Sequence, residues 1–140
     1  MGLTWAEHLS VGNGMIDAEH KNLIVVVNSV EHAIGTRDHI ALSKVFDLLD
    51  TYIHIHFRNE EKIAEAIKFP FVQIKLEHRH LLNEVRYMRE ELEAMNGIWS
   101  DDLVKKYSRF LSGWMADHII KEDMQMKPVL QTYPYDFKPG

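Results

Sequence analysis

The chain has 140 residues, of which 46% are hydrophobic and 26% are charged, and its net charge is -5 with histidine neutral. This length and composition are typical of a single globular domain, residues 1–140. The acidic balance argues against nucleic acid and anionic membrane surfaces as partners, because both attract basic side chains. The sequence has no cysteine, which excludes disulfides, thiolate metal sites and a cysteine nucleophile, and which fits a cytoplasmic location.

The chain opens with an irregular stretch, predicted to be an N-terminal arm over residues 1–16. Trp5 and Leu9 are its large apolar side chains, and we expect them to attach the arm to the rest of the domain. Asp17 precedes the apolar-periodic segment "AEHKNLIVVVNSVEHAI", and Gly35 follows it. An acidic N-cap and a terminal glycine predict a first helix from about Ala18 to Ile34. Its longest apolar run, "LIVVV", is too short to cross a bilayer.

Two further helices follow, separated by a proline. Asp38 opens the second, in which apolar side chains recur every three or four residues, the pattern of an amphipathic helix. These positions are Ile40, Val45, Leu48, Leu49, Tyr52, Ile53, His56 and Phe57. Pro70 ends this segment, because proline cannot continue a helix. The third helix is predicted from about Phe71 to Met95.

A fourth helix completes an all-α chain. Asn96 and Gly97 form a natural stop, and Ser100 or Asp101 caps the next apolar row, which reaches His118. Four long helices joined by short turns favour an up-down-up-down antiparallel four-helix bundle, here spanning about residues 18–127. Residues 128–140 are expected to be a C-terminal tail, which could lead to a further domain in a longer protein.

Nine histidines are many for this length, and their spacing points to a metal site. Each predicted helix has one histidine on its apolar face, and burying four imidazoles without partners is costly, whereas a shared cation satisfies them. These are His20, His56, His78 and His118. The other five are expected to face solvent or to be structural: His8, His32, His39, His54 and His80.

Two carboxylates extend this set. Glu60 follows His56 by four residues, so both lie on one face of the second helix. Asp123 follows His118 by five, an interval that is about 140° off on an α-helix. The two can reach one centre only if the helix loosens, forms a π-bulge or ends there. With cysteine absent, the predicted metal chemistry is nitrogen plus carboxylate oxygen, and the two carboxylates could bridge two metals.

The motifs "GNGMIDAEHKNL", "HFRNEEK", "EHRHLL" and "WMADHIIKED" resemble those of the hemerythrin family in its bacterial form, in the family's order and at nearly its spacing. The resemblance covers the chain from Trp5 to about Leu130. It implies a four-helix bundle that holds two irons joined by an oxo or hydroxo bridge, with O2 or a small anion such as azide as the exogenous ligand. It also implies one metal set: His20 and His56 on the open iron, His78 and His118 on the second, and Glu60 and Asp123 as bridges.

The chain departs from this pattern at one position. The family has a histidine one turn before His78, and here that place is held by Ile74. His80 faces the wrong way to replace it, and Glu77, about 100° from His78, is a poor substitute unless the helix is distorted there. Apolar residues expected around the O2 pocket are Leu23, Trp114 and Met115.

A missing histidine is expected to open a second labile position and to speed autoxidation. That favours an oxygen or redox sensor over an oxygen store, for instance the input domain of a diguanylate cyclase or chemoreceptor, with no enzymatic activity of its own. The alternatives are a stand-alone O2 carrier, a diiron oxidase or peroxidase, and a protein that handles nitric oxide or iron. The reversed order His-x-x-x-Glu argues against ferritin-like diiron enzymes, which use Glu-x-x-His. A metal-free helical interaction module is the remaining alternative.

Overall fold

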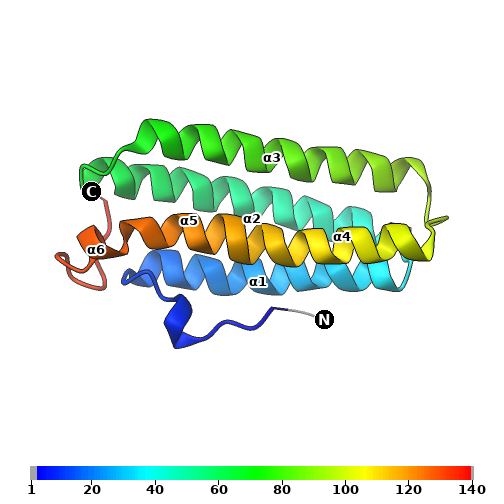
Figure 1. Ribbon diagram of the computed structural model, residues 1–140, viewed down its shortest axis with the longest axis horizontal. Helices are drawn as coiled ribbons and strands as arrows, with labels where there is room; N and C mark the ends of the chain where they lie inside the picture. The colour runs from blue at the N-terminus through cyan, green and yellow to red at the C-terminus, as the bar shows by residue number, and fades with distance from the viewer. Residues whose placement is uncertain (1–2, 140) are drawn as a thin grey trace.

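A computed structural model describes residues 3–139 of the protein, except for the side chain of His118. Four long helical rods lie side by side in antiparallel order, as predicted (Figure 1). The first three rods are α1 (Gly14–Gly35), α2 (His39–Ala66) and α3 (Phe71–Ala94). The fourth is composite: α4 (Asp101–Gly113), a π-helical segment η2 (Trp114–Ile120), α5 (Lys121–Asp123), a 3-10 turn η3 (Met124–Met126) and α6 (Lys127–Leu130). Helix α1 lies against α2 and α4, and α2 lies against α3.

Side-chain caps fix the beginnings of three of these rods. Asp38 caps α2 by accepting from the Ala41 amide, and Ser100 caps α4 by accepting from the Leu103 amide. Both caps agree with the sequence prediction. The predicted start of α1 at Ala18 is wrong: the helix begins at Gly14, because the side chain of Asn13 accepts hydrogen bonds from the amides of the first turn.

Asp17, predicted as the cap of α1, is buried inside the helix and has a different role. Its carboxylate accepts hydrogen bonds from the Val11 amide (3.0 Å), the Ser10 hydroxyl (2.5 Å) and the Tyr135 hydroxyl (2.8 Å). The carboxylate therefore joins the N-terminal arm and the C-terminal tail to the start of α1. The hydrogen bond to Asp17 and partial burial raise the pKa of Tyr135 to about 12.

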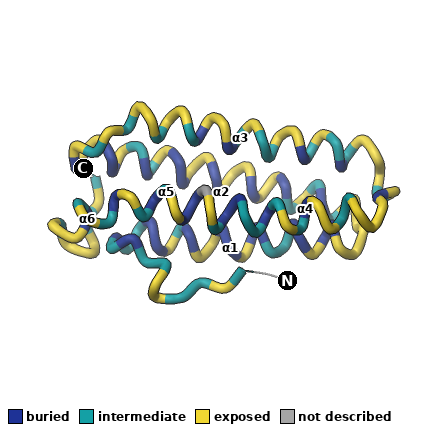
Figure 2. Tube along the Cα trace, in the orientation of Figure 1, coloured by how far each residue is buried: buried dark blue, intermediate teal, exposed yellow. Residues whose placement is uncertain are grey.

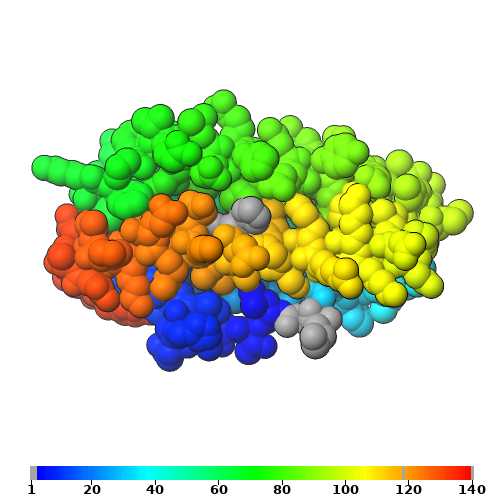
Figure 3. Space-filling model, in the orientation of Figure 1, coloured from blue at the N-terminus to red at the C-terminus, as the bar shows by residue number. Residues whose placement is uncertain are grey.

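Both ends of the chain are packed on the bundle. The arm contains a short 3-10 turn, η1 (Glu7–Leu9), and Trp5 and Leu9 pack against the core, as predicted. In the space-filling view the blue arm lies below the orange part of the fourth rod, and the red tail closes one end of the molecule (Figure 3). The tail begins with α6, and Tyr133 and Phe137 pack against buried residues of that end.

The interior consists of two apolar clusters separated by polar side chains. The larger cluster runs along the bundle from Leu23 and Phe57 to Trp99. The smaller one, around Ile16 and Ile63, fills the end near the chain termini. Buried positions follow the inward faces of all four rods, while the outer face of α3 is exposed (Figure 2). The layer between the clusters contains His20, His56, Glu60 and Asp123.

Candidate metal centre

Four buried donor side chains from three rods converge between the two apolar clusters. His20 comes from α1, His56 and Glu60 from α2, and Asp123 from α5. One ligand atom of each lies within 4.8 Å of all the others, and each side chain is at least 98% buried. Side chains so arranged are able to hold a metal ion.

The two histidines of this group face the same carboxylate oxygen. Oδ2 of Asp123 lies 2.5 Å from Nε2 of His20 and 3.0 Å from Nε2 of His56. Oε2 of Glu60 lies 3.1 Å from Nε2 of His56. Both imidazoles therefore present Nε2 to one point, flanked by two carboxylates.

His78 forms a second part of the same site. Its Nε2 lies 3.3 Å from Oε1 of Glu60, so the two oxygens of Glu60 face different histidines, His56 and His78. This is the disposition of a carboxylate that bridges two metals. The His78 ring stacks on Phe57 with ring centroids 3.8 Å apart and an angle of 1° between the planes. The stacking fixes the orientation of the imidazole.

His118 was predicted as a further donor, but its side chain lies outside the described part of the structure. Its backbone belongs to the π-helical segment η2. A loosened helix was the condition under which Asp123, five residues on, could share a centre with residue 118. The structure meets that condition, and the role of His118 stays a prediction.

Two carboxylates that the sequence analysis missed hold the outer nitrogens of the histidines. Oε1 of Glu19 lies 2.8 Å from Nδ1 of His56, and Oε2 of Glu19 accepts a 2.5 Å hydrogen bond from Asn59. Oε2 of Glu61 lies 2.9 Å from Nδ1 of His78. A carboxylate on Nδ1 leaves Nε2 as the nitrogen that faces the site and raises its basicity as a ligand.

The polar layer has strongly altered proton affinities. Burial lowers the pKa of His56, but hydrogen bonds to the surrounding carboxylates outweigh it and raise that pKa well above the ordinary value. The pKa of His78 is raised in the same way, against burial, by its carboxylate partners. Burial and the neighbouring Asp123 raise the pKa of Glu60. Burial works against the ionised form of Asp123, yet its hydrogen bonds lower its pKa below the usual range.

These side chains fit a metal ion of borderline character between hard and soft. The donors are imidazole nitrogens and carboxylate oxygens, which suit iron. Within the polar layer, Oε2 of Glu60 and Nδ1 of His20 are buried without a hydrogen bond among the described residues. Oε2 of Glu60 lies 3.1 Å from Nε2 of His56, and a metal held by both side chains would satisfy this oxygen.

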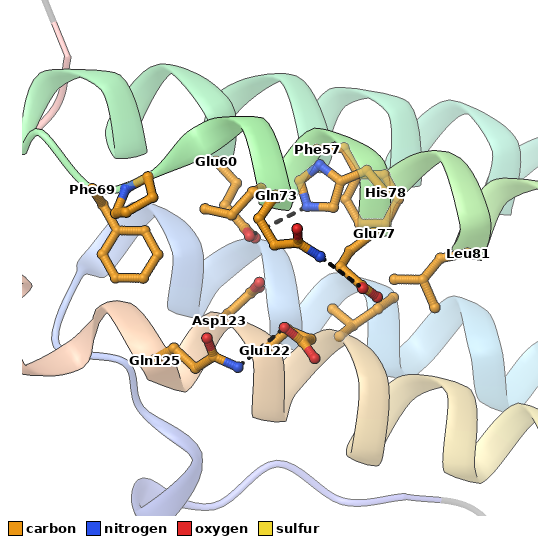
Figure 4. Close-up of a pocket in the computed structure, with 13 residues that line it drawn as sticks. Phe57, Glu60, Phe69, Gln73, Glu77, His78, Leu81, Glu122, Asp123 and Gln125 are labelled. Carbon is orange, nitrogen blue, oxygen red and sulfur yellow. Dashed lines mark hydrogen bonds and ion pairs between the residues drawn. The ribbon is translucent and has the colours of Figure 1, made fainter.

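A cavity opens beside His78, between α3 and the α5 segment (Figure 4). Its volume is about 180 Å³, room for several waters. Glu60 and Asp123 form its inner wall, and Ile74 lines it as well. Leu23, Trp114 and Met115 are buried in the apolar core and do not line this cavity in the described structure, so their place around an O2 pocket stays a prediction.

The remaining histidines agree with their predicted separation from the site. All five are exposed: His8, His32, His39, His54 and His80. Within the described residues, no helix is long and apolar enough to cross a membrane.

Comparisons with known proteins agree with this architecture. Residues 11–130 match the family model described as the hemerythrin HHE cation binding domain. The chain is 26% identical to a bacteriohemerythrin of Stenotrophomonas maltophilia, over 99% of this chain and 90% of that protein. It is 26% identical to a bacteriohemerythrin of Methylococcus capsulatus, over 93% and 98%. A crystal structure of a hemerythrin mutant superposes with a TM-score of 0.75 at 24% identity, covering 92% of this chain and 97% of that one. The chain therefore belongs to the hemerythrin family of diiron, O2-binding domains.

Proposed function

We propose that this domain holds two irons in the polar layer between the apolar clusters. His20 and His56 would hold one iron, and His78 and the predicted ligand His118 the other, with Glu60 and Asp123 shared. Two features support this assignment: Asp123 presents one oxygen to both His20 and His56, and Glu60 presents its two oxygens to different histidines. Bound iron supplies reversible affinity for O2 and a change of oxidation state.

The two halves of the site differ in their access to water. His20 and His56 are fully buried, and Leu23, three residues after His20, is 1% exposed. Trp114 and Met115 are also buried in the larger apolar cluster. We place the O2 pocket against these apolar side chains, because they exclude water and offer no acid group to protonate a bound ligand.

The half that contains His78 adjoins the open cavity, and this one observation favours a sensor. Water and small anions can reach that half, whereas durable O2 storage needs a dry site that resists oxidation. We therefore infer an oxygen- or redox-sensing input domain, in which the oxidation state of the centre changes the fold around it. A stand-alone O2 carrier is the alternative.

The experiment is a cycle of O2 exposure and removal on the reduced, iron-loaded protein, followed by visible absorption. We expect the wild type to convert to the ferric form within few cycles, and Ile74→His, which adds an imidazole on the cavity wall, to convert more slowly. Equal, slow conversion in both proteins, with full recovery of the reduced spectrum, would instead establish a carrier.

A sensor must also change shape with its oxidation state. Hydrogen exchange of residues 124–137, which follow Asp123 directly and reach back to the start of α1, is expected to differ between the ferrous and ferric proteins. Identical exchange in both states would argue against sensing through this route.

A further inference from the structure

The cavity beside His78 is lined by several side chains that could bind a metal. Its lining on α3 comes from Gln73, Ile74, Glu77, His78 and Leu81. The last four are spaced as i, i+3, i+4 and i+7 and so lie on one face of the helix. Figure 4 shows Glu77 extending from α3 toward the α5 segment, on the same side as His78. Glu77 therefore lies on the cavity side of α3.

Protein donors around the His78 half are few. Among the described residues, His78 is the only imidazole that lines the cavity, and Glu60 and Asp123 are the buried carboxylates on its inner wall. Ile74, one turn before His78, offers no donor atom. Of the two oxygens of Glu60, Oε1 faces His78 at 3.3 Å and Oε2 faces His56 at 3.1 Å, so Glu60 offers one oxygen to a metal at His78. A metal bound here by these groups would need further ligands from the cavity.

Four other polar side chains line the cavity: Gln73, Glu77, Glu122 and Gln125. Carboxylates are better ligands for iron than amides are, which leaves the two glutamates. Glu122 is held by Gln125 at 3.1 Å, whereas Glu77 has only a long 3.4 Å contact with Gln73. Both glutamates are half-buried, and Glu77 lies next to His78 in sequence. It is therefore the freer carboxylate of the two.

We propose that Glu77 is a protein ligand of the metal that His78 holds, in the place that Ile74 leaves without a donor. This rests on the proposed diiron function. The second metal position would then be richer in oxygen than the first, with Glu77 joining Glu60 and Asp123 around a single described imidazole. An oxygen-rich position favours a harder ion, so the ferric state there is stabilised relative to an all-imidazole position.

The test is metal binding by the metal-free protein, measured by Co2+ titration calorimetry and by elemental analysis after gel filtration. We expect the wild type to bind two ions per chain. In Glu77→Gln, which has the same size and no charge, the first ion should bind as before and the second at least about 10-fold more weakly. Glu122→Gln, on the opposite wall of the same cavity, is the matched control and should retain both ions.

A rescue variant makes the assignment specific. Ile74→His in the Glu77→Gln background supplies an imidazole from the same helix face and should restore the second ion. Unchanged binding of both ions by Glu77→Gln, or an equal loss in Glu122→Gln, would overturn the role of Glu77. A wild type that binds fewer than two ions would overturn the diiron function itself, and the inference with it. Circular dichroism of each variant confirms that the fold is intact.

Discussion

At the scale of single residues, two carboxylates contact the outer nitrogens of the candidate ligand histidines. Glu61 holds Nδ1 of His78 and Glu19 holds Nδ1 of His56. Each fixes the tautomer and the ring orientation that turn Nε2 toward the centre. Loss of such a partner typically weakens metal affinity by about 10- to 100-fold.

Glu61→Ala should therefore weaken the metal position that contains His78 by about 10- to 100-fold and leave the position of His20 and His56 unchanged. Glu65→Ala, an exposed residue one turn along α2, is the control and should bind both ions as the wild type does. The measurement is the Co2+ affinity of each position by titration calorimetry. Equal affinities in the two variants would show that Glu61 does not orient His78.

Sequence reasoning predicted the candidate ligands but not the carboxylates that contact them. His56, His78 and Glu60 were identifiable because periodicity places them on apolar helix faces. Glu19 lies 37 residues from His56, and Glu61 lies 17 from His78, so no helical interval relates each to its histidine. Contacts of this kind depend on how the helices pack against one another. The spacing of residues within one helix does not predict that packing.

At the scale of elements, capping residues and proline predicted the ends of helices correctly where no second capping residue lay nearby. Asp38 and Pro70 act alone, and α2 and α3 begin where they predict. Two good caps compete at the start of α1. Asn13 caps the helix, because its side-chain amide is also held by a hydrogen bond that it donates to the Phe137 carbonyl. The Asp17 carboxylate instead accepts a hydrogen bond from the Tyr135 hydroxyl. Both partners come from the far end of the chain.

The apolar row predicted for α2 was broader than the face that is buried. Leu49 is 0% exposed, but Ile40, Leu48 and Tyr52 are 64%, 50% and 39% exposed. Intervals of three and four residues place apolar side chains in a stripe along the helix. Packing against the neighbouring helices determines which part of that stripe is buried. The interval of five between His118 and Asp123 was more informative, because the chain does form a π-helical segment there.

Adjacent leucines on α2 give a direct test of this boundary. Leu49→Ala should destabilise the protein by about 2–5 kcal/mol, since it removes buried methyl groups and leaves a cavity. Leu48→Ala should change stability by less than about 0.5 kcal/mol. Urea unfolding of the two variants measures the difference. Equal losses would mean that the outer edge of the stripe is covered as well.

At the scale of the whole molecule, the fold places a polar layer inside an apolar bundle, and metal and protons compete for it. In the metal-free protein, His56 and His78 have raised pKa values, so they favour the protonated form in the folded state. That contribution is fully present below the ordinary value of 6.5 and is lost as the pH rises through the folded pKa values. Metal binding displaces these protons and should strengthen as the pH rises.

The metal-free protein should therefore become less stable as the pH rises above about 6.5, by about 1.4 kcal/mol for each unit of pKa shift. The iron-loaded protein should not lose stability over that range. Thermal unfolding with and without a chelator measures both trends. A metal-free Tm that stays level or rises across this range would show that the histidines are not protonated in the fold.

The central claim is that one polar layer holds two metals, with Glu60 and Asp123 between them. Anomalous diffraction from crystals of the iron-loaded protein tests it most directly. The account predicts two iron peaks per chain, one beside His20 and His56 and the other beside His78, each also contacted by Glu60 or Asp123. A single peak, or a second peak remote from His78, would contradict it.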